Sequence, residues 1–155
     1  MNQDFFKITQ NLEPLLNKLL NMKPVKPSAL PKIIPLKGIY LFSEEDQHMY
    51  VGRSNTIRKR IQNHCRPSSI HTAAAFAFRI AREETGMLDA TYEKEGSRKE
   101  LMNNAVFLIS FSSAKERIKK MDLRYIEVKK PINQAIFEIF VHLALLTKYN
   151  DFENH

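Results

Sequence analysis

Arg60 and His64 are two residues whose types and spacing suit work on a phosphate group. Four residues apart in a helical segment, they would project from one face about one turn apart. An arginine offers a fork of donors that can hold two phosphate oxygens, and it stays charged at any relevant pH. A histidine titrates near neutral pH, so His64 could orient a water molecule or act as a base. The pair therefore favours phosphate chemistry, with a solvated basic helix as the alternative.

Glu138 is a third candidate, because it is the only acidic residue of the apolar segment 131–148. We expect its carboxylate to lie at the edge of a hydrophobic core, since its neighbours are Ile136, Phe137, Ile139 and Phe140. Hydrolysis of a phosphodiester needs an attacking water, neutralisation of charge on the phosphoryl oxygens, and help for the departing 3′-oxygen. A carboxylate at such an edge could contribute to these tasks, whereas a glutamate that simply faces solvent would not.

A hairpin carries the most specific pattern in the sequence. Gly38-Ile39-Tyr40 lies on one expected strand and Tyr50-Val51-Gly52 on the next, with nine residues between them. A pair of tyrosines on adjacent strands is usually part of a core, and either tripeptide could occur by chance. The residues that follow in chain order are Arg60, His64, Glu138 and Asn150. This ordered set resembles the GIY-YIG nuclease superfamily from Gly38 to Asn150, with valine replacing the isoleucine of the second tripeptide.

The resemblance implies a catalytic site. The implied catalytic residues are Tyr40, Tyr50, Arg60, His64, Glu138 and Asn150. Tyr40 would position or deprotonate the attacking water, His64 would be its partner or the alternative base, and Tyr50 would line the site. Gly38 and Gly52 would allow close approach of backbone segments.

The resemblance also implies a metal. Arg60 would stabilise the phosphate, and Glu138 would bind the ion. One carboxylate cannot form a two-metal clamp, so we expect a single Mg²⁺ or Mn²⁺ that is ligated mostly by water. Asn150 would hydrogen-bond a phosphate or a site residue, and Asn154 competes with it for this assignment.

The charge balance favours a polyanionic partner. The chain has 24 Lys+Arg and 17 Asp+Glu, a formal net charge of +7. Segment 53–66 contains five basic residues and no acid, and segment 115–130 contains seven basic residues and three acids. Besides Arg60, the expected nucleic-acid contacts of the first segment are Arg53, Arg58, Lys59 and Arg66. The leading hypothesis is thus a metal-dependent DNA endonuclease, with RNA as the alternative substrate.

Two other hypotheses stay open. The chain could be a nucleic-acid-binding module of the same fold that has lost turnover, although the intact set of site residues argues against this. It could also be an assembly subunit whose helix 12–22 recruits a partner. One site cuts one strand, so a double-strand break needs a homodimer or two successive nicks. The sequence leaves open whether cleavage is sequence-specific or structure-specific, and whether the role is restriction, repair or mobility of a genetic element.

The elements that must position these residues form an α/β (α+β) fold. An apolar stripe predicts a helix in 1–23 that packs on the core or contacts a second copy; its residues are Leu12, Leu15, Leu16, Leu19 and Leu20. Pro14 belongs in a first turn, so we expect a shorter turn or a kink before it. Four prolines in 24–35 predict a stiff, extended connector. We therefore divide the chain into 1–35, packed on the domain, and the nuclease-like domain 36–155.

Strand and helix signals follow one another through the domain. Strands are expected at 36–43, 48–53 and 122–130, with a polar turn at 44–47. Helices are expected at 54–65, 71–85 and 113–121, and from Pro131 onward, with a loop at 87–96. Segment 98–111 fits either a helix, which we favour, or a buried strand. This order predicts a mainly antiparallel three-stranded sheet flanked by helices.

Composition excludes several classes of protein. Cys65 is the only cysteine, so an internal disulfide is excluded, and no Cys/His cluster has the spacing of a zinc site. We expect Cys65 to be a small apolar residue of a helix seam with Ile57 and Ile61. No segment approaches the ~18 apolar residues of a membrane span, and the first residues lack a signal pattern. We expect a cytoplasmic, intracellular protein with no membrane partner.

Overall fold

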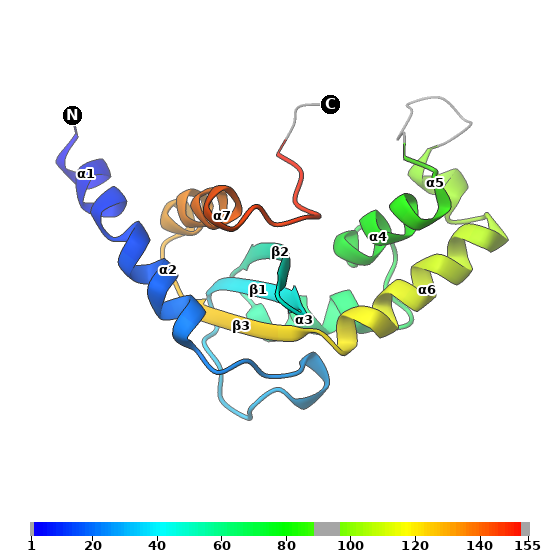
Figure 1. Ribbon diagram of the computed structural model, residues 1–155, viewed down its shortest axis with the longest axis horizontal. Helices are drawn as coiled ribbons and strands as arrows, with labels where there is room; N and C mark the ends of the chain where they lie inside the picture. The colour runs from blue at the N-terminus through cyan, green and yellow to red at the C-terminus, as the bar shows by residue number, and fades with distance from the viewer. Residues whose placement is uncertain (1, 89–96, 153–155) are drawn as a thin grey trace. The chain divides into compact units, whose positions relative to one another are not determined.

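A three-stranded sheet organises the fold, with strand order β2-β1-β3 and antiparallel pairing throughout. The computed structural model describes residues 2–88 and 97–152. In chain order the elements are α1 (Gln3–Gln10), α2 (Leu12–Asn21), a 3₁₀ turn η1 (Pro27–Ala29), β1 (Gly38–Glu44), β2 (Gln47–Ser54), α3 (Ile57–Cys65), α4 (Ala75–Thr85), α5 (Arg98–Leu101), α6 (Ala105–Lys119), β3 (Asp122–Glu127) and α7 (Pro131–Leu145). The predicted fold class, an antiparallel sheet flanked by helices, is confirmed (Figure 1).

The chain forms two compact units. The first comprises 1–58 and 121–155 and contains the sheet with α1, α2 and α7. The second comprises 59–120 and contains α4, α5 and α6, while α3 begins in the first unit and continues into the second. The domain boundary expected at 35/36 falls inside the first unit and stays a prediction. Within 2–88 and 97–152, no helix is long and apolar enough to cross a membrane.

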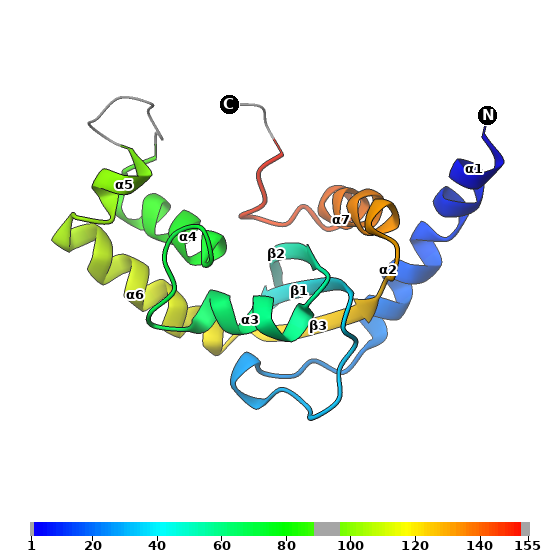
Figure 2. The same cartoon turned by 180° about the vertical axis from the view of Figure 1, so that it is seen from behind.

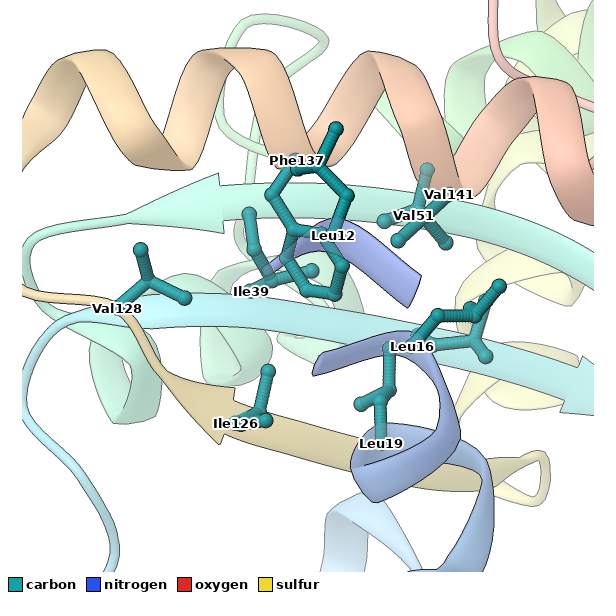
Figure 3. Close-up of a cluster of buried hydrophobic side chains, with 10 residues drawn as sticks. Leu12, Leu16, Leu19, Ile39, Val51, Ile126, Val128, Phe137 and Val141 are labelled. Atoms are coloured by element: carbon teal, nitrogen blue, oxygen red, sulfur yellow. The ribbon is translucent and has the colours of Figure 1, made fainter. Parts of the chain in front are cut away.

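The core of the first unit lies between one face of the sheet and helices α2 and α7. Side chains alternate along a strand, so this face takes Ile39 and Leu41 from β1 and Val51 from β2. The helices contribute Leu12, Leu16, Leu19, Phe137 and Val141. Figure 3 shows Phe137 and Val141 reaching from α7 toward the strands. The leucine stripe that the sequence predicts is therefore the buried side of α2.

Both outer edges of the sheet are covered. The proline-rich connector pairs with β3, since the amide N of Val25 donates to the Leu123 carbonyl at 2.9 Å and the Leu123 amide donates back at 2.8 Å. On β2, the amide of Tyr149 donates to the Met49 carbonyl at 2.9 Å. An exposed strand edge can pair with a strand of another molecule. Here the connector covers the edge at β3, and the segment after α7 covers the edge at β2.

The second unit departs from the sequence prediction at two helix boundaries. Helix α4 begins at Ala75 rather than near 71, because the amides of Ala73 and Ala74 both bond to the Ile70 carbonyl and form a separate turn. Segments 98–111 and 113–121 do not form two helices divided at 112. Instead, the side chain of Asn104 caps α6 by accepting from the Phe107 amide at 3.0 Å, and α6 then runs unbroken. Most of the loop expected at 87–96 lies outside the described residues.

Aromatic packing joins α4 to α6, which lie side by side in both views (Figures 1 and 2). The Phe78 ring lies 5.0 Å from that of Phe107. Lys115, only 3% exposed, places its ammonium group 4.1 Å from the centre of the Phe111 ring and donates to the Pro67 carbonyl at 2.9 Å. Burial lowers the pKa of Lys115. One of the seven basic residues counted in 115–130 is thus part of the interior.

Candidate active site

The two tripeptides of the hairpin meet directly. Tyr40 and Gly52 are cross-strand partners, and a Cβ on Gly52 would lie 2.2 Å from the Tyr40 hydroxyl oxygen, so the phenol ring rests on the glycine. The rings of Tyr40 and Tyr50 are 6.4 Å apart, and by strand alternation both lie on the sheet face opposite the α7 core. A Cβ on Gly38 would likewise lie 1.9 Å from the Ile126 carbonyl oxygen. Both glycines are therefore required by close packing.

Glu138 projects from α7 beside β2. Its Oε2 accepts a hydrogen bond from Nε of Arg53 at 3.0 Å, and its side chain is 16% exposed. The carboxylate therefore lies at the edge of the core, as its apolar neighbours on α7 suggest. The ion pair with Arg53 was not expected, because the sequence placed Arg53 among the nucleic-acid contacts.

Asn150 binds the backbone of the second tripeptide. Its Oδ1 accepts from the Val51 amide at 2.8 Å, and its Nδ2 donates to the Val51 carbonyl at 2.7 Å. The side-chain amide thereby acts like one residue of an added strand on the outer edge of β2. The Asn150 amide thus binds the backbone of a tripeptide residue, and its role in a catalytic site stays a prediction. Asn154, the competing candidate, lies outside the described residues.

Arg60 and His64 lie on α3, in the second unit. Nη1 of Arg60 donates to the Ala73 carbonyl at 3.1 Å, and the His64 ring makes an edge contact with Phe76 at 6.3 Å between ring centres. His64 is fully buried; its burial, aided by the positive charge of Arg60, lowers its pKa to about 3. The expected titration of His64 near neutral pH is wrong, and the imidazole is neutral at pH 7.

A signal for this burial was present in the sequence. Ile57, Ile61 and His64 fall at i, i+4 and i+7, so the histidine shares the apolar stripe of α3. Cys65 is also buried, as expected for a seam residue, and its burial raises the pKa of its thiol to about 11. A thiol held protonated in this way is not a nucleophile at neutral pH.

A family comparison identifies the fold. The family model for the GIY-YIG catalytic domain matches residues 36–150, which is most of the chain. The chain belongs to the GIY-YIG family. This confirms the resemblance drawn from the two tripeptides and the residues that follow them. GIY-YIG domains have a nuclease-type fold, and the family consists generally of endonucleases that typically depend on a divalent metal. No curated protein and no solved structure gives a significant match.

The residues of this GIY-YIG domain fit one kind of metal site. In the described ranges 2–88 and 97–152, no three or more His, Cys, Asp or Glu side chains gather in a way that could hold an ion. Mg²⁺ usually keeps several waters and takes one or two carboxylates together with oxygens of a bound phosphate. A single partly exposed carboxylate such as Glu138 suits a hydrated ion of this type, rather than a cage built by the protein alone.

The basic residues of 53–66 other than Arg60 divide into two groups. Arg53 is bound to Glu138, and Arg58 donates to the carbonyls of Pro31 and Lys32, so both have partners within the protein. Lys59 and Arg66 are exposed on and just after α3. The contacts of Arg58 tie the start of α3 to the connector, which is a structural task in addition to any contact with nucleic acid.

The buried His64 predicts a specific pH dependence of stability. Its pKa is about 3 in the folded protein and about 6.5 when unfolded, so the unfolded state binds more protons between these values. Stability is therefore full above pH 6.5 and falls on acidification toward pH 3, by about 2 kcal/mol between pH 6.5 and pH 5. Urea unfolding at pH 7.5 and 5.0 should show this loss, and His64→Leu should remove it. An equal loss in both proteins would contradict the assignment, because titration of carboxylates is common to both.

Proposed function

We propose that the protein is a metal-dependent endonuclease that hydrolyses DNA phosphodiester bonds. The observation that carries the proposal is that all six catalytic residues implied by the resemblance are present in the matched region, 36–150. A domain that had lost turnover would be free to lose its arginine or its glutamate. The packing of Tyr40 on Gly52 and the location of Glu138 at the edge of the core also support it.

Four residues of the first unit have proposed roles in the site. Tyr40, held on Gly52, positions the attacking water and, in its phenolate form, accepts the proton that the water loses, and Tyr50 lines the same face of the sheet. Glu138 is the residue that would hold Mg²⁺ or Mn²⁺. The chemistry that this ion supplies when bound is neutralisation of the charge on the phosphoryl oxygens and on the departing 3′-oxygen. Asn150 holds the strand that carries Tyr50.

Arg60 and His64 have proposed roles on the phosphate. The guanidinium of Arg60 binds two phosphoryl oxygens as negative charge develops on them. His64 is a poor general base near pH 7, since a group with a pKa of about 3 holds a proton only weakly. Tyr40 is therefore the preferred base, and His64 remains a neutral hydrogen-bonding group. The family resemblance joins these two residues to Tyr40 and Glu138 in one reaction.

The proposed substrate contacts come from exposed basic side chains. Lys59 and Arg66 can bind backbone phosphates without reading bases, and Arg53 could add to them if it exchanges Glu138 for a phosphate. Such contacts make binding sensitive to salt. They do not distinguish DNA from RNA, so both belong in the test.

The test is cleavage of plasmid DNA, labelled DNA duplexes and labelled RNA at a fixed salt concentration. With Mg²⁺ we expect DNA cleavage that leaves 3′-hydroxyl and 5′-phosphate ends, because the 3′-oxygen is the leaving group. EDTA should stop the reaction, and excess Mg²⁺ should restore it. Salt-sensitive binding without cleavage under any divalent metal would instead support the alternative, a catalytically inactive nucleic-acid-binding module.

A further inference from the structure

A chain of hydrogen bonds leads from α7 to the second tripeptide of the hairpin. His142, near the end of α7, lies with its Nδ1 2.7 Å from Oγ1 of Thr147. The Thr147 hydroxyl donates to Oδ1 of Asn150, also at 2.7 Å. Asn150 in turn bonds to both the amide and the carbonyl of Val51. All four residues belong to the first unit.

The partners fix the direction of every bond in this chain. The Val51 amide needs an acceptor and its carbonyl needs a donor, so the Asn150 amide can bind them in one orientation only. The Oδ1 atom of Asn150 can only accept hydrogen bonds, so the Thr147 hydroxyl must donate its single hydrogen to Asn150. The Thr147 oxygen can then only accept from His142. The histidine must therefore carry a hydrogen on Nδ1 and donate it to the Thr147 oxygen.

The backbone between His142 and Asn150 is shaped for these contacts. Helix α7 ends at Leu145, and Leu146 adopts a left-handed conformation with φ of 51° although its side chain is mostly exposed. That conformation is unfavourable for a non-glycine residue and persists only where the surroundings impose it. The turn places Thr147 in the interior, 3% exposed, between its two partners.

We propose that His142 and Thr147 are positioning residues of the nuclease site. They hold the amide of Asn150, and Asn150 holds Val51 between Tyr50 and Gly52. Gly52 is the surface on which Tyr40 rests, so the chain of bonds reaches the proposed water-activating group through the backbone of β2. This inference rests on the proposed endonuclease function. It adds two residues that neither the tripeptides nor the family set includes.

Thr147 and His142 each offer a pair of variants that separates loss of the hydrogen bond from loss of packing. Thr147→Val removes the hydroxyl at nearly constant volume, and Thr147→Ser keeps it. His142→Asn keeps a donor near the place of Nδ1, while His142→Gln moves it to the place of Nε2. Thr9→Val is the matched control, because the Thr9 hydroxyl donates to a helix carbonyl, that of Phe6, at 2.9 Å.

The first measurement is steady-state cleavage of a DNA duplex with Mg²⁺. For Thr147→Val and His142→Gln we expect kcat to fall about tenfold to a hundredfold, since small misplacements of catalytic groups have effects of this size. KM should change less than about threefold, because none of these residues is proposed to touch DNA. Thr147→Ser and His142→Asn should recover most of the rate. Equal losses in both members of a pair would overturn the proposal in favour of a purely structural role.

The second measurement is hydrogen exchange at the Val51 amide, which does not depend on activity. In Thr147→Val and His142→Gln we expect exchange at Val51 to accelerate about tenfold or more, since its acceptor is no longer held in place. The control Thr9→Val should not change it. If exchange at Val51 did not change, the chain of hydrogen bonds from His142 to Val51 would not be what holds this amide, and the proposal would be overturned. A different result would overturn the proposed function instead. The variants would change exchange at Val51 as expected, but the wild-type protein would cleave no nucleic acid, so the proposed effect on catalysis would fall as well.

Discussion

Replacing Glu138 by glutamine is expected to lower kcat about a thousandfold while leaving the fold intact. Glutamine keeps the size of the side chain and an oxygen that can accept from Nε of Arg53, but it loses the negative charge. Removing one group that stabilises transition-state charge typically costs a factor of about a hundred to a thousand. Since the described residues offer no cluster of ligands that could take its place, we expect the effect at the upper end of this range. The measurement is single-turnover cleavage at saturating Mg²⁺.

Two variants test whether the charge of Glu138 serves a metal or only Arg53. Arg53→Gln breaks the same ion pair but leaves the carboxylate, so it should affect DNA binding and its salt dependence more than kcat. Glu127→Gln removes an exposed carboxylate at the end of β3, whose partner Lys129 lies 3.8 Å away, and should have little effect. Equal losses of kcat in Glu138→Gln and Arg53→Gln would show that catalysis needs the ion pair between these residues rather than Glu138 as a metal ligand. Calorimetric titration of Mn²⁺ into each protein with bound DNA gives a second, independent readout.

The arrangement of the sheet and its helices could be read from patterns that are local in sequence. Two apolar, β-rich segments on either side of the polar turn 44–47 predicted the hairpin, and the leucine stripe of α2 predicted its buried side. The sequence also indicated that Gly52 allows a close approach, and the register of the hairpin in the structure makes Tyr40 its partner. Such features depend only on residues that are close in sequence and on the geometry of one hairpin, and this is why they can be predicted from the sequence.

The contacts that hold the site together could not be predicted in this way. Arg53 and Glu138 are 85 residues apart in sequence, and Val51 and Asn150 are 99 apart. No periodic pattern links such positions, because each contact depends on how α7 and the segment after it lie against β2. The sequence suggested that Asn150 serves the site, but not that its partner is backbone.

Charge patterns were the least reliable guide, for a related reason. Lys115 and Arg58 were both counted in basic stretches, yet Lys115 donates to carbonyls in the interior of the second unit and Arg58 to carbonyls of the connector. A count of charges cannot separate a cation that faces solvent from one that satisfies buried backbone oxygens. The positive excess of the chain therefore overstates the surface that nucleic acid could contact, and Lys59 and Arg66 are the better candidates.

Gly52→Ala is expected to lower kcat about a hundredfold and to destabilise the protein by about 1–3 kcal/mol. The added Cβ would lie 2.2 Å from the hydroxyl oxygen of Tyr40 and 2.3 Å from Cζ, which is far closer than atoms can approach. Tyr40 is almost fully buried, so its ring cannot move aside without disturbing the neighbouring rings of Phe42 and Tyr50. The phenol would have to leave the position from which it is proposed to act.

Gly86→Ala separates this effect from simple loss of stability. Gly86 ends α4 with φ of 71°, and a Cβ there would meet nothing within 4 Å, so alanine should cost about 1 kcal/mol through backbone strain alone. At a temperature where both variants remain folded, Gly86→Ala should cleave DNA at the wild-type rate and Gly52→Ala should not. If Gly52→Ala retained full kcat, Tyr40 could not be the group that activates water, since its ring would no longer occupy the same place. Chemical denaturation and single-turnover cleavage on the same samples decide between these outcomes.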